Sequence, residues 1–189
     1  MDTIKFVIEH YEDAKAGYRF PVVNIYINGQ DLIDLVTRVE QKNWDGSKNT
    51  RSSYIGFEVD QFHQFHDEML GKKRRKFSVI LTCTCTYAEC NCIMANMVFD
   101  THTVTWSDMK SPWLSGKTPS PWIDEAEAQE LDWHPLGYAG LGPFVFDREQ
   151  YLLALDKVTQ EYTERGRKLR FCLIQFLPQR PQRALRKTS

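Results

Sequence analysis

Apolar residues recur along this chain with two spacings, and these spacings predict both strands and helices. Every second residue is apolar over residues 4–8 and 23–27, a spacing typical of strands, and we expect the second strand to run over residues 19–27. Apolar residues recur every three or four positions over residues 32–40 and 59–69, a spacing typical of amphipathic helices. Gly71 follows the second of these segments and predicts the end of its helix.

The middle of the chain predicts a meander of three strands. Apolar residues and cysteines alternate with mostly polar ones over residues 77–85, and residues 91–99 are apolar on both faces. The second of these segments should therefore be a buried central strand. Residues 104–106 are expected to add a third strand, and a loop rich in proline should follow over residues 108–121.

The last third of the chain predicts two more helices. Ser120 and Pro121 suit the first positions of a helix that should end at about Trp133, with a glycine-rich connector and a strand after it. Asp147 and Gln150 resemble a capping box at the start of the other helix. The apolar stripe of that helix has four members: Tyr151, Leu155, Val158 and Tyr162. Gly166 should end it, and residues 169–177 should form a last strand.

This order of elements predicts an α+β fold with a mostly antiparallel sheet, a central meander and three to four helices. We expect one globular domain over residues 1–178 and a basic, disordered tail over residues 179–189. The chain has 189 residues, of which 42% are hydrophobic and 26% charged. These values are ordinary for a single globular domain.

The overall charge and the first residues of the chain indicate where the protein is located and which large partners it attracts. With a formal net charge of -1, the protein as a whole is not attracted electrostatically to nucleic acid or anionic lipid. No apolar run approaches the length of a membrane span, and residues 1–6 do not resemble a signal peptide. We therefore expect a cytoplasmic protein without membrane association. An odd number of cysteines, five, argues against a disulfide framework in such a protein.

Four of the five cysteines fall within ten residues as two C-x-C pairs: Cys83, Cys85, Cys90 and Cys92. If Cys85 lies opposite Cys90 in a hairpin, Cys83 lies opposite Cys92 and all four sulfurs share one face. Such a set could bind Zn²⁺, although structural zinc sites usually have longer C-x2-C spacings. The same residues also continue the apolar face of the strand, as core thiols would. A redox or disulfide role is a third alternative.

Catalytic chemistry has little support in the sequence. His63, His66 and Asp67 could hold a metal on one helix, but ordinary helix-surface positions explain them better. There is no G-x-S-x-G motif, and the glycines of residues 137–142 do not have the order of a dinucleotide loop. We assign no catalytic residue and expect a protein that is not an enzyme.

An acidic segment flanked by tryptophans is the candidate partner-binding surface. Its members are Trp122, Asp124, Glu125, Glu127, Glu130, Asp132 and Trp133. Clustered charge speeds and selects association, and aromatic residues are favoured in interfaces. A solvated helix face is the simpler interpretation of the charges.

Two segments are basic instead, residues 72–76 and the region from Arg165 onward. The first, just after a helix, is typical of a solvated turn favoured by the helix dipole. Nucleic-acid binding through both segments is the alternative.

Four segments together resemble an uncharacterised bacterial family, frequent in actinobacteria. They are the strand–turn–helix of residues 25–35, the C-x-C-x4-C segment of residues 81–90, the V-x-W-S-D of residues 104–108 and the LGPFVFDREQY of residues 141–151. Thr86 and Glu89 stand where that family has glycines, and Cys92 is an additional cysteine. The resemblance implies a shared fold and no particular activity.

Our leading hypothesis is a non-enzymatic intracellular binding protein, an immunity or antitoxin-type partner of a bacterial toxin. It needs no cofactor. The alternative is a small zinc protein or metalloenzyme that uses the four cysteines. A weaker alternative is nucleic-acid binding through the basic segments.

Overall fold

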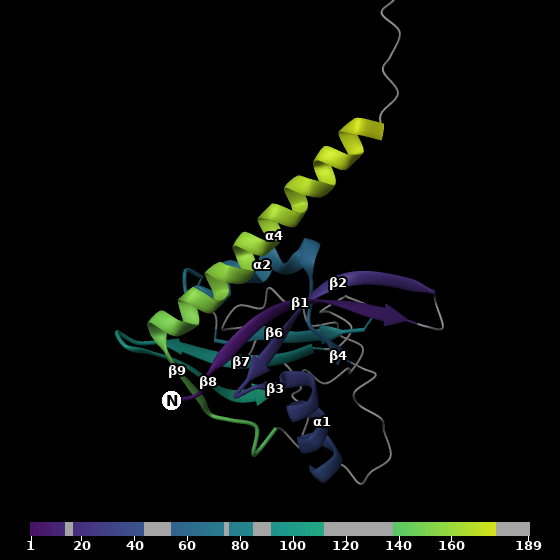
Figure 1. Ribbon diagram of the computed structural model, residues 1–189. Helices are drawn as coiled ribbons and strands as arrows, with labels where there is room; N and C mark the ends of the chain where they lie inside the picture. The colour runs from purple at the N-terminus through teal and green to yellow at the C-terminus, as the bar shows by residue number, and fades with distance from the viewer. Residues whose placement is uncertain (14–16, 44–53, 74–75, 85–91, 112–137, 177–189) are drawn as a thin grey trace, which may run out of the picture.

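The computed structural model describes residues 1–13, 17–43, 54–73, 76–84, 92–111 and 138–176. Within them it has two antiparallel sheets and three helices, as the α+β prediction expects (Figure 1). None of these helices is long and apolar enough to cross a membrane.

The first sheet is organised around β2 (Tyr18–Ile27). β1 (Ile4–Asp13) pairs with it along its full length, so that Ile4 lies opposite Ile27. The short strands β3 (Gln30–Asp31) and β5 (Phe57–Glu58) pair with its other edge, β3 at the last two residues of β2 and β5 near its middle, at Val22 and Val23. Asn28 and Gly29 both have positive φ angles, of 52° and 75°, which is the backbone of a tight hairpin turn.

Gly56 carries the chain from one sheet into the other. It stands between β4 (Tyr54–Ile55), in the second sheet, and β5 in the first. A Cβ atom at this position would lie 2.1 Å from the carbonyl oxygen of Val23, so only glycine fits. The hydroxyl of Thr82 donates a hydrogen bond of 2.8 Å to the Gly56 carbonyl and fixes this crossing.

The second sheet has the order β4-β6-β7-β8-β9 and contains the predicted meander. Its longer strands are β6 (Ser78–Cys83), β7 (Cys92–Phe99), β8 (Thr103–Lys110) and β9 (Phe144–Asp147). β7 is central and buried over residues 92–95, as predicted, but it ends exposed, with Val98 51% accessible. β8 continues to Lys110, beyond the predicted strand end, through an irregularity where Asp108 has a φ of 51°.

Asp2 joins the sheets at a second place. It forms a parallel bridge with Phe146 of β9, and its N–H donates to the Val145 carbonyl at 2.7 Å. Its carboxylate accepts hydrogen bonds of 2.7 Å from the Val145 N–H and from the Asn28 side chain. These bonds lower the pKa of Asp2, the one from Asn28 most.

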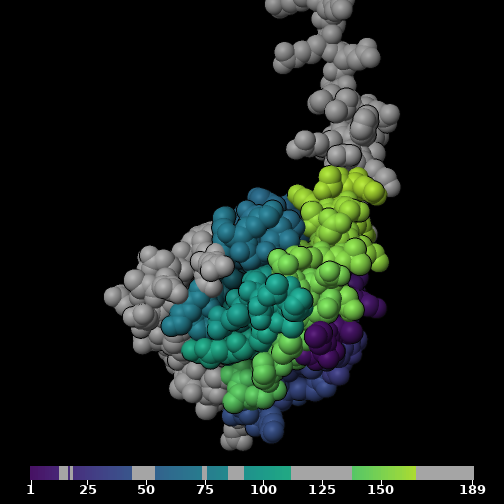
Figure 2. Space-filling model, turned by 90° about the vertical axis from the view of Figure 1, so that its left-hand side faces the viewer, coloured from purple at the N-terminus to yellow at the C-terminus, as the bar shows by residue number. Residues whose placement is uncertain are grey.

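Three helices lie against the sheets: α1 (Leu32–Asn43), α2 (Val59–Met69) and α4 (Arg148–Phe176). Figure 2 shows α2 beside the first half of α4. The predicted start of α4 is confirmed, because Asp147 accepts a hydrogen bond of 2.9 Å from the Gln150 N–H.

The predicted end of α4 was wrong. The helix passes through Gly166 to Phe176, and its far end extends beyond the sheets in Figure 1. Residues 169–176, which were expected to form a strand, belong to this helix instead. Gly166 costs a helix only about 1 kcal/mol, and its neighbours Arg165 and Arg167 are good helix formers.

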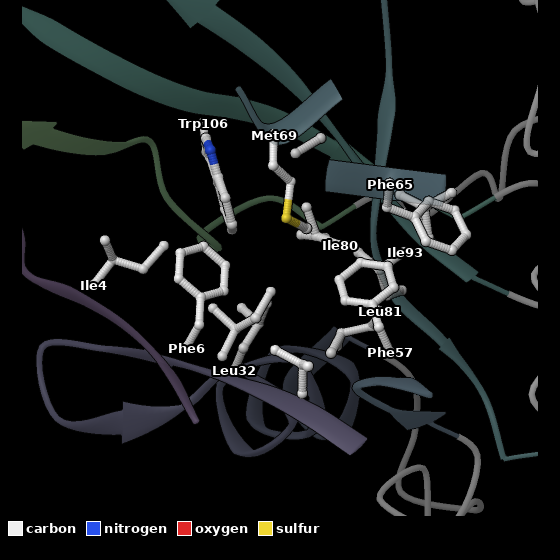
Figure 3. Packing of buried hydrophobic residues seen from close by; sticks show 14 of the residues in the cluster. Ile4, Phe6, Leu32, Phe57, Phe65, Met69, Ile80, Leu81, Ile93 and Trp106 are labelled. Carbon is white, nitrogen blue, oxygen red and sulfur yellow. The ribbon is translucent and has the colours of Figure 1, made fainter. Parts of the chain in front are cut away.

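The apolar core lies between the sheets and under the helices. Figure 3 shows Phe57, Phe65 and Leu81 gathered at one side of it, with Phe6 and Trp106 at the other. The rings of Phe57 and Phe65 have centroids 4.8 Å apart. The predicted α4 stripe belongs to this core: Tyr151, Leu155 and Val158 are fully buried, and Tyr162 packs at its margin.

Candidate functional site

A carboxylate and two tyrosine hydroxyls meet inside the core. The Tyr138 hydroxyl donates a hydrogen bond of 2.7 Å to Glu40 Oε1, and the Tyr54 hydroxyl donates one of 3.2 Å to the same atom. The two hydroxyls are 3.3 Å apart. Glu40, Tyr54 and Tyr138 are only 1%, 3% and 4% exposed. We call these three residues the polar cluster.

Three distant elements supply the polar cluster. Glu40 lies near the end of α1, Tyr54 begins β4, and Tyr138 precedes β9. Residues 44–53 connect the end of α1 to Tyr54 in the sequence, and residues 112–137 directly precede Tyr138. Both of these segments lie outside the described residues. The polar cluster fixes Tyr54 and Tyr138, which directly follow them in the chain.

The electrostatics of the polar cluster favour neutral tyrosines bonded to a carboxylate. Burial raises the pKa of Tyr138 most, and the neighbouring Tyr54 and the Glu40 carboxylate raise it further. The Tyr138 hydroxyl therefore keeps its proton and acts as a donor. Glu40 Oε2 is buried and has no hydrogen-bond partner in the described structure. Buried and already bonded to each other, these groups brace the fold rather than meet a substrate.

Analysis of the sequence missed the polar cluster, although one signal was present. Ile33, Val36 and Thr37 are buried on α1, and Glu40 follows them at helical spacing on the same face. A charged residue at the end of a buried stripe needs a polar partner. Nothing in the sequence identifies Tyr138, which is 98 residues away, as that partner.

The predicted pairing of Cys83 with Cys92 was wrong. Cys92 lies opposite Thr82, and Cys83 lies opposite Tyr54 of β4. Because side chains alternate along a strand, Cys83 and Cys92 point to opposite faces of the sheet. The register changes between Val79 and Leu81, which leaves Ile80 as an extra residue and shifts the phase of the strand.

The zinc site itself stays a prediction. Cys85 and Cys90 lie outside the described residues. Among the residues that are described, no three of the types His, Cys, Asp and Glu come close enough to hold a metal. Cys92 is buried and Cys83 partly so.

The candidate histidines belong to the surface and margin of α2. His63 is exposed, and its Nδ1 lies 2.8 Å from the carbonyl oxygen of Asp60. His66 is partly buried against the Phe62 ring, with centroids 6.1 Å apart. Burial lowers the pKa of His66.

The predicted partner-binding residues, from Trp122 to Trp133, lie outside the described residues. The structure describes the positions on either side of them. Ser111, which directly follows β8, is 5% exposed, and Tyr138 belongs to the polar cluster. Both ends of the segment of residues 112–137 are therefore held in the protein body.

No family model, curated protein or solved structure matches this chain. The resemblance to a bacterial family therefore stays a prediction from the four sequence segments.

Proposed function

We propose that this protein is a non-enzymatic binding protein whose partner contacts the acidic segment of residues 122–133. The observation that carries the proposal is the attachment of residues 112–137 to the body at both ends. Ser111 is buried at one end, and Tyr138 is bonded to Glu40 at the other. Segments that connect the elements of a rigid scaffold commonly carry binding residues.

The residue types of the segment indicate the chemistry of its partner. The five acids of the segment favour a basic partner surface. Trp122 and Trp133 would supply the aromatic contacts that often dominate binding energy.

The class of the partner follows from the sequence hypothesis. In an immunity or antitoxin role, the partner would be a toxin with a basic surface. A cytoplasmic location belongs to the same proposal.

The acidic segment can be tested by neutralising its charge. The protein, tagged at the C-terminus because Asp2 is part of the sheet junction, is used to capture partners from native lysate. The variant carries Asp124→Asn, Glu125→Gln, Glu127→Gln, Glu130→Gln and Asp132→Asn. A matched control neutralises five exposed acids elsewhere: Glu12, Asp60, Glu149, Asp156 and Glu164.

We expect wild type and control to capture the same protein and the acidic-segment variant to lose it. Cross-links between the partner and residues 112–137 would locate the contact. Equal capture by both variants, or cross-links confined to other surfaces, would overturn the proposal.

A further inference from the structure

Lysines from two separate parts of the chain gather around Phe77. The Lys110 Nζ, from the end of β8, lies 4.9 Å from the centroid of the Phe77 ring. The Lys76 Nζ lies 6.0 Å from the same centroid. The sequence shows only the run of residues 72–76, and the fold adds Lys110 to it. Lys73 and Lys72 precede Lys76 by three and four positions in the sequence, and we call these three residues and Lys110 the basic patch.

The start of the basic patch has a defined position at the end of α2. Gly71 has a φ of 69°, and a Cβ atom there would lie 2.8 Å from the Phe99 ring. The backbone N–H groups of Lys72 and Lys73 donate to the Asp67 carbonyl at 2.9 and 3.2 Å. These bonds end the helix and hold the first two lysines in place.

Most of the charge of the basic patch faces solvent. Lys72, Lys73 and Lys76 are exposed, and none of them forms an ion pair with another residue in the described parts of the chain. Lys110 is paired with Asp108 at 3.0 Å. The field of Lys72 also opposes protonation of His66. A surface with this much unneutralised positive charge attracts anions.

We propose that the basic patch binds the phosphate backbone of nucleic acid, independently of the acidic segment. Lysine ammonium groups bind phosphates as point charges and release counterions from the polymer. Phe77 is 5% exposed, so its ring cannot stack on bases. The patch therefore recognises charge and not base sequence.

The test measures fluorescence anisotropy of a labelled, mixed-sequence DNA duplex with the full-length protein at several salt concentrations. The patch variant is Lys72→Gln, Lys73→Gln and Lys76→Gln. A matched control changes Lys5, Lys42 and Lys157, which are also exposed. A tail variant changes Arg180, Arg183, Arg186 and Lys187 to glutamine, because these basic residues could bind the duplex instead.

We expect wild type to bind more weakly as salt rises, with a linear dependence of log K on log salt. The patch variant should lower the slope by about 2 to 3, because each phosphate that a lysine neutralises adds about 0.9 to the slope. The control should keep the wild-type slope, and a second duplex of different sequence should bind equally well. Lys110→Gln should reduce the slope by about 1 or less.

Three results would overturn the proposal. They are no binding by wild type at low salt, the same reduction of slope in control and patch variants, and a reduction only in the tail variant. Poly-glutamate is added as a competitor at the same concentration of charge as the duplex. If it displaces the duplex, the patch binds an acidic protein instead. Thermal unfolding of each variant shows that the fold is kept.

Discussion

Two regions of the core use buried tyrosines in opposite ways. In the polar cluster, the Tyr54 and Tyr138 hydroxyls both donate to Glu40. In the aromatic cluster, formed by Phe6, Trp106, Phe146 and Tyr151, the rings make most of the contacts. Tyr151 lies 5.8 to 6.1 Å from the other three ring centroids.

Within the described residues, the polar side-chain atoms of the aromatic cluster have no hydrogen-bond partners. Tyr151 Oη and Trp106 Nε1 are both buried and unbonded in the described structure. Burial raises the pKa of Tyr151, and the Trp106 N–H opposes this shift without meeting the geometry of a hydrogen bond. Tyr151 therefore stabilises the fold through its buried ring. Tyr138 stabilises it through a bonded hydroxyl, which phenylalanine lacks.

Trp106→Ala should have the largest effect on stability. Trp106 is fully buried and contacts Phe146 and Tyr151, so the variant leaves a large cavity in the aromatic cluster. We expect a loss of about 3–5 kcal/mol in the free energy of unfolding, measured by urea denaturation. Val98→Ala, at an exposed position of β7, is the control and should change little. A loss below about 1 kcal/mol in Trp106→Ala would mean that the rings do not form the core.

Tyr138→Phe should cost less, about 1.5–3 kcal/mol, because it removes a hydrogen bond to a buried carboxylate. A double-mutant cycle with Glu40→Gln measures the interaction directly. The two substitutions should be non-additive by about 0.5–3 kcal/mol, because Tyr138→Phe removes the donor of the bond and Glu40→Gln removes the charge of its acceptor. Additive effects would show that Tyr138 and Glu40 act independently and would remove the distinction between the clusters.

The aromatic cluster was easier to predict from the sequence than the polar cluster. Tyr151 and Leu155 were correctly predicted as core residues because their helical spacing is local. The bond between Glu40 and Tyr138 depends on how α1 and the chain before β9 come together, which no local pattern encodes. The prediction of the cysteine register was wrong for a similar reason. The extra residue Ile80 depends on packing on both faces of β6, which no local pattern encodes.

Asp2→Asn compares a carboxylate near the surface with Glu40 in the core. Both accept two hydrogen bonds, and we expect Asp2 to contribute less to the free energy of unfolding. We expect a loss of about 1 kcal/mol near pH 7. The folded-state pKa of Asp2 is below its ordinary value of 3.8, so its contribution is present above 3.8 and lost as pH falls through the folded pKa. Urea denaturation from pH 7 to 3 should show wild type and variant converging at the acidic end. Glu164→Gln, an exposed control on α4, should follow wild type throughout. A difference that does not shrink in acid would exclude this carboxylate as its cause.

Tyr151→Phe should have the smallest effect and the opposite sign. Removing a buried hydroxyl that has no partner removes a desolvation cost and keeps the ring contacts with Phe6, Trp106 and Phe146. We expect the variant to be equal to wild type or more stable by up to about 1 kcal/mol, measured in the same denaturation series as Tyr138→Phe. The same substitution in the two clusters then gives opposite results, because only one hydroxyl is bonded. If Tyr151→Phe loses as much stability as Tyr138→Phe, the Tyr151 hydroxyl has a partner in solution and both clusters depend on polar contacts.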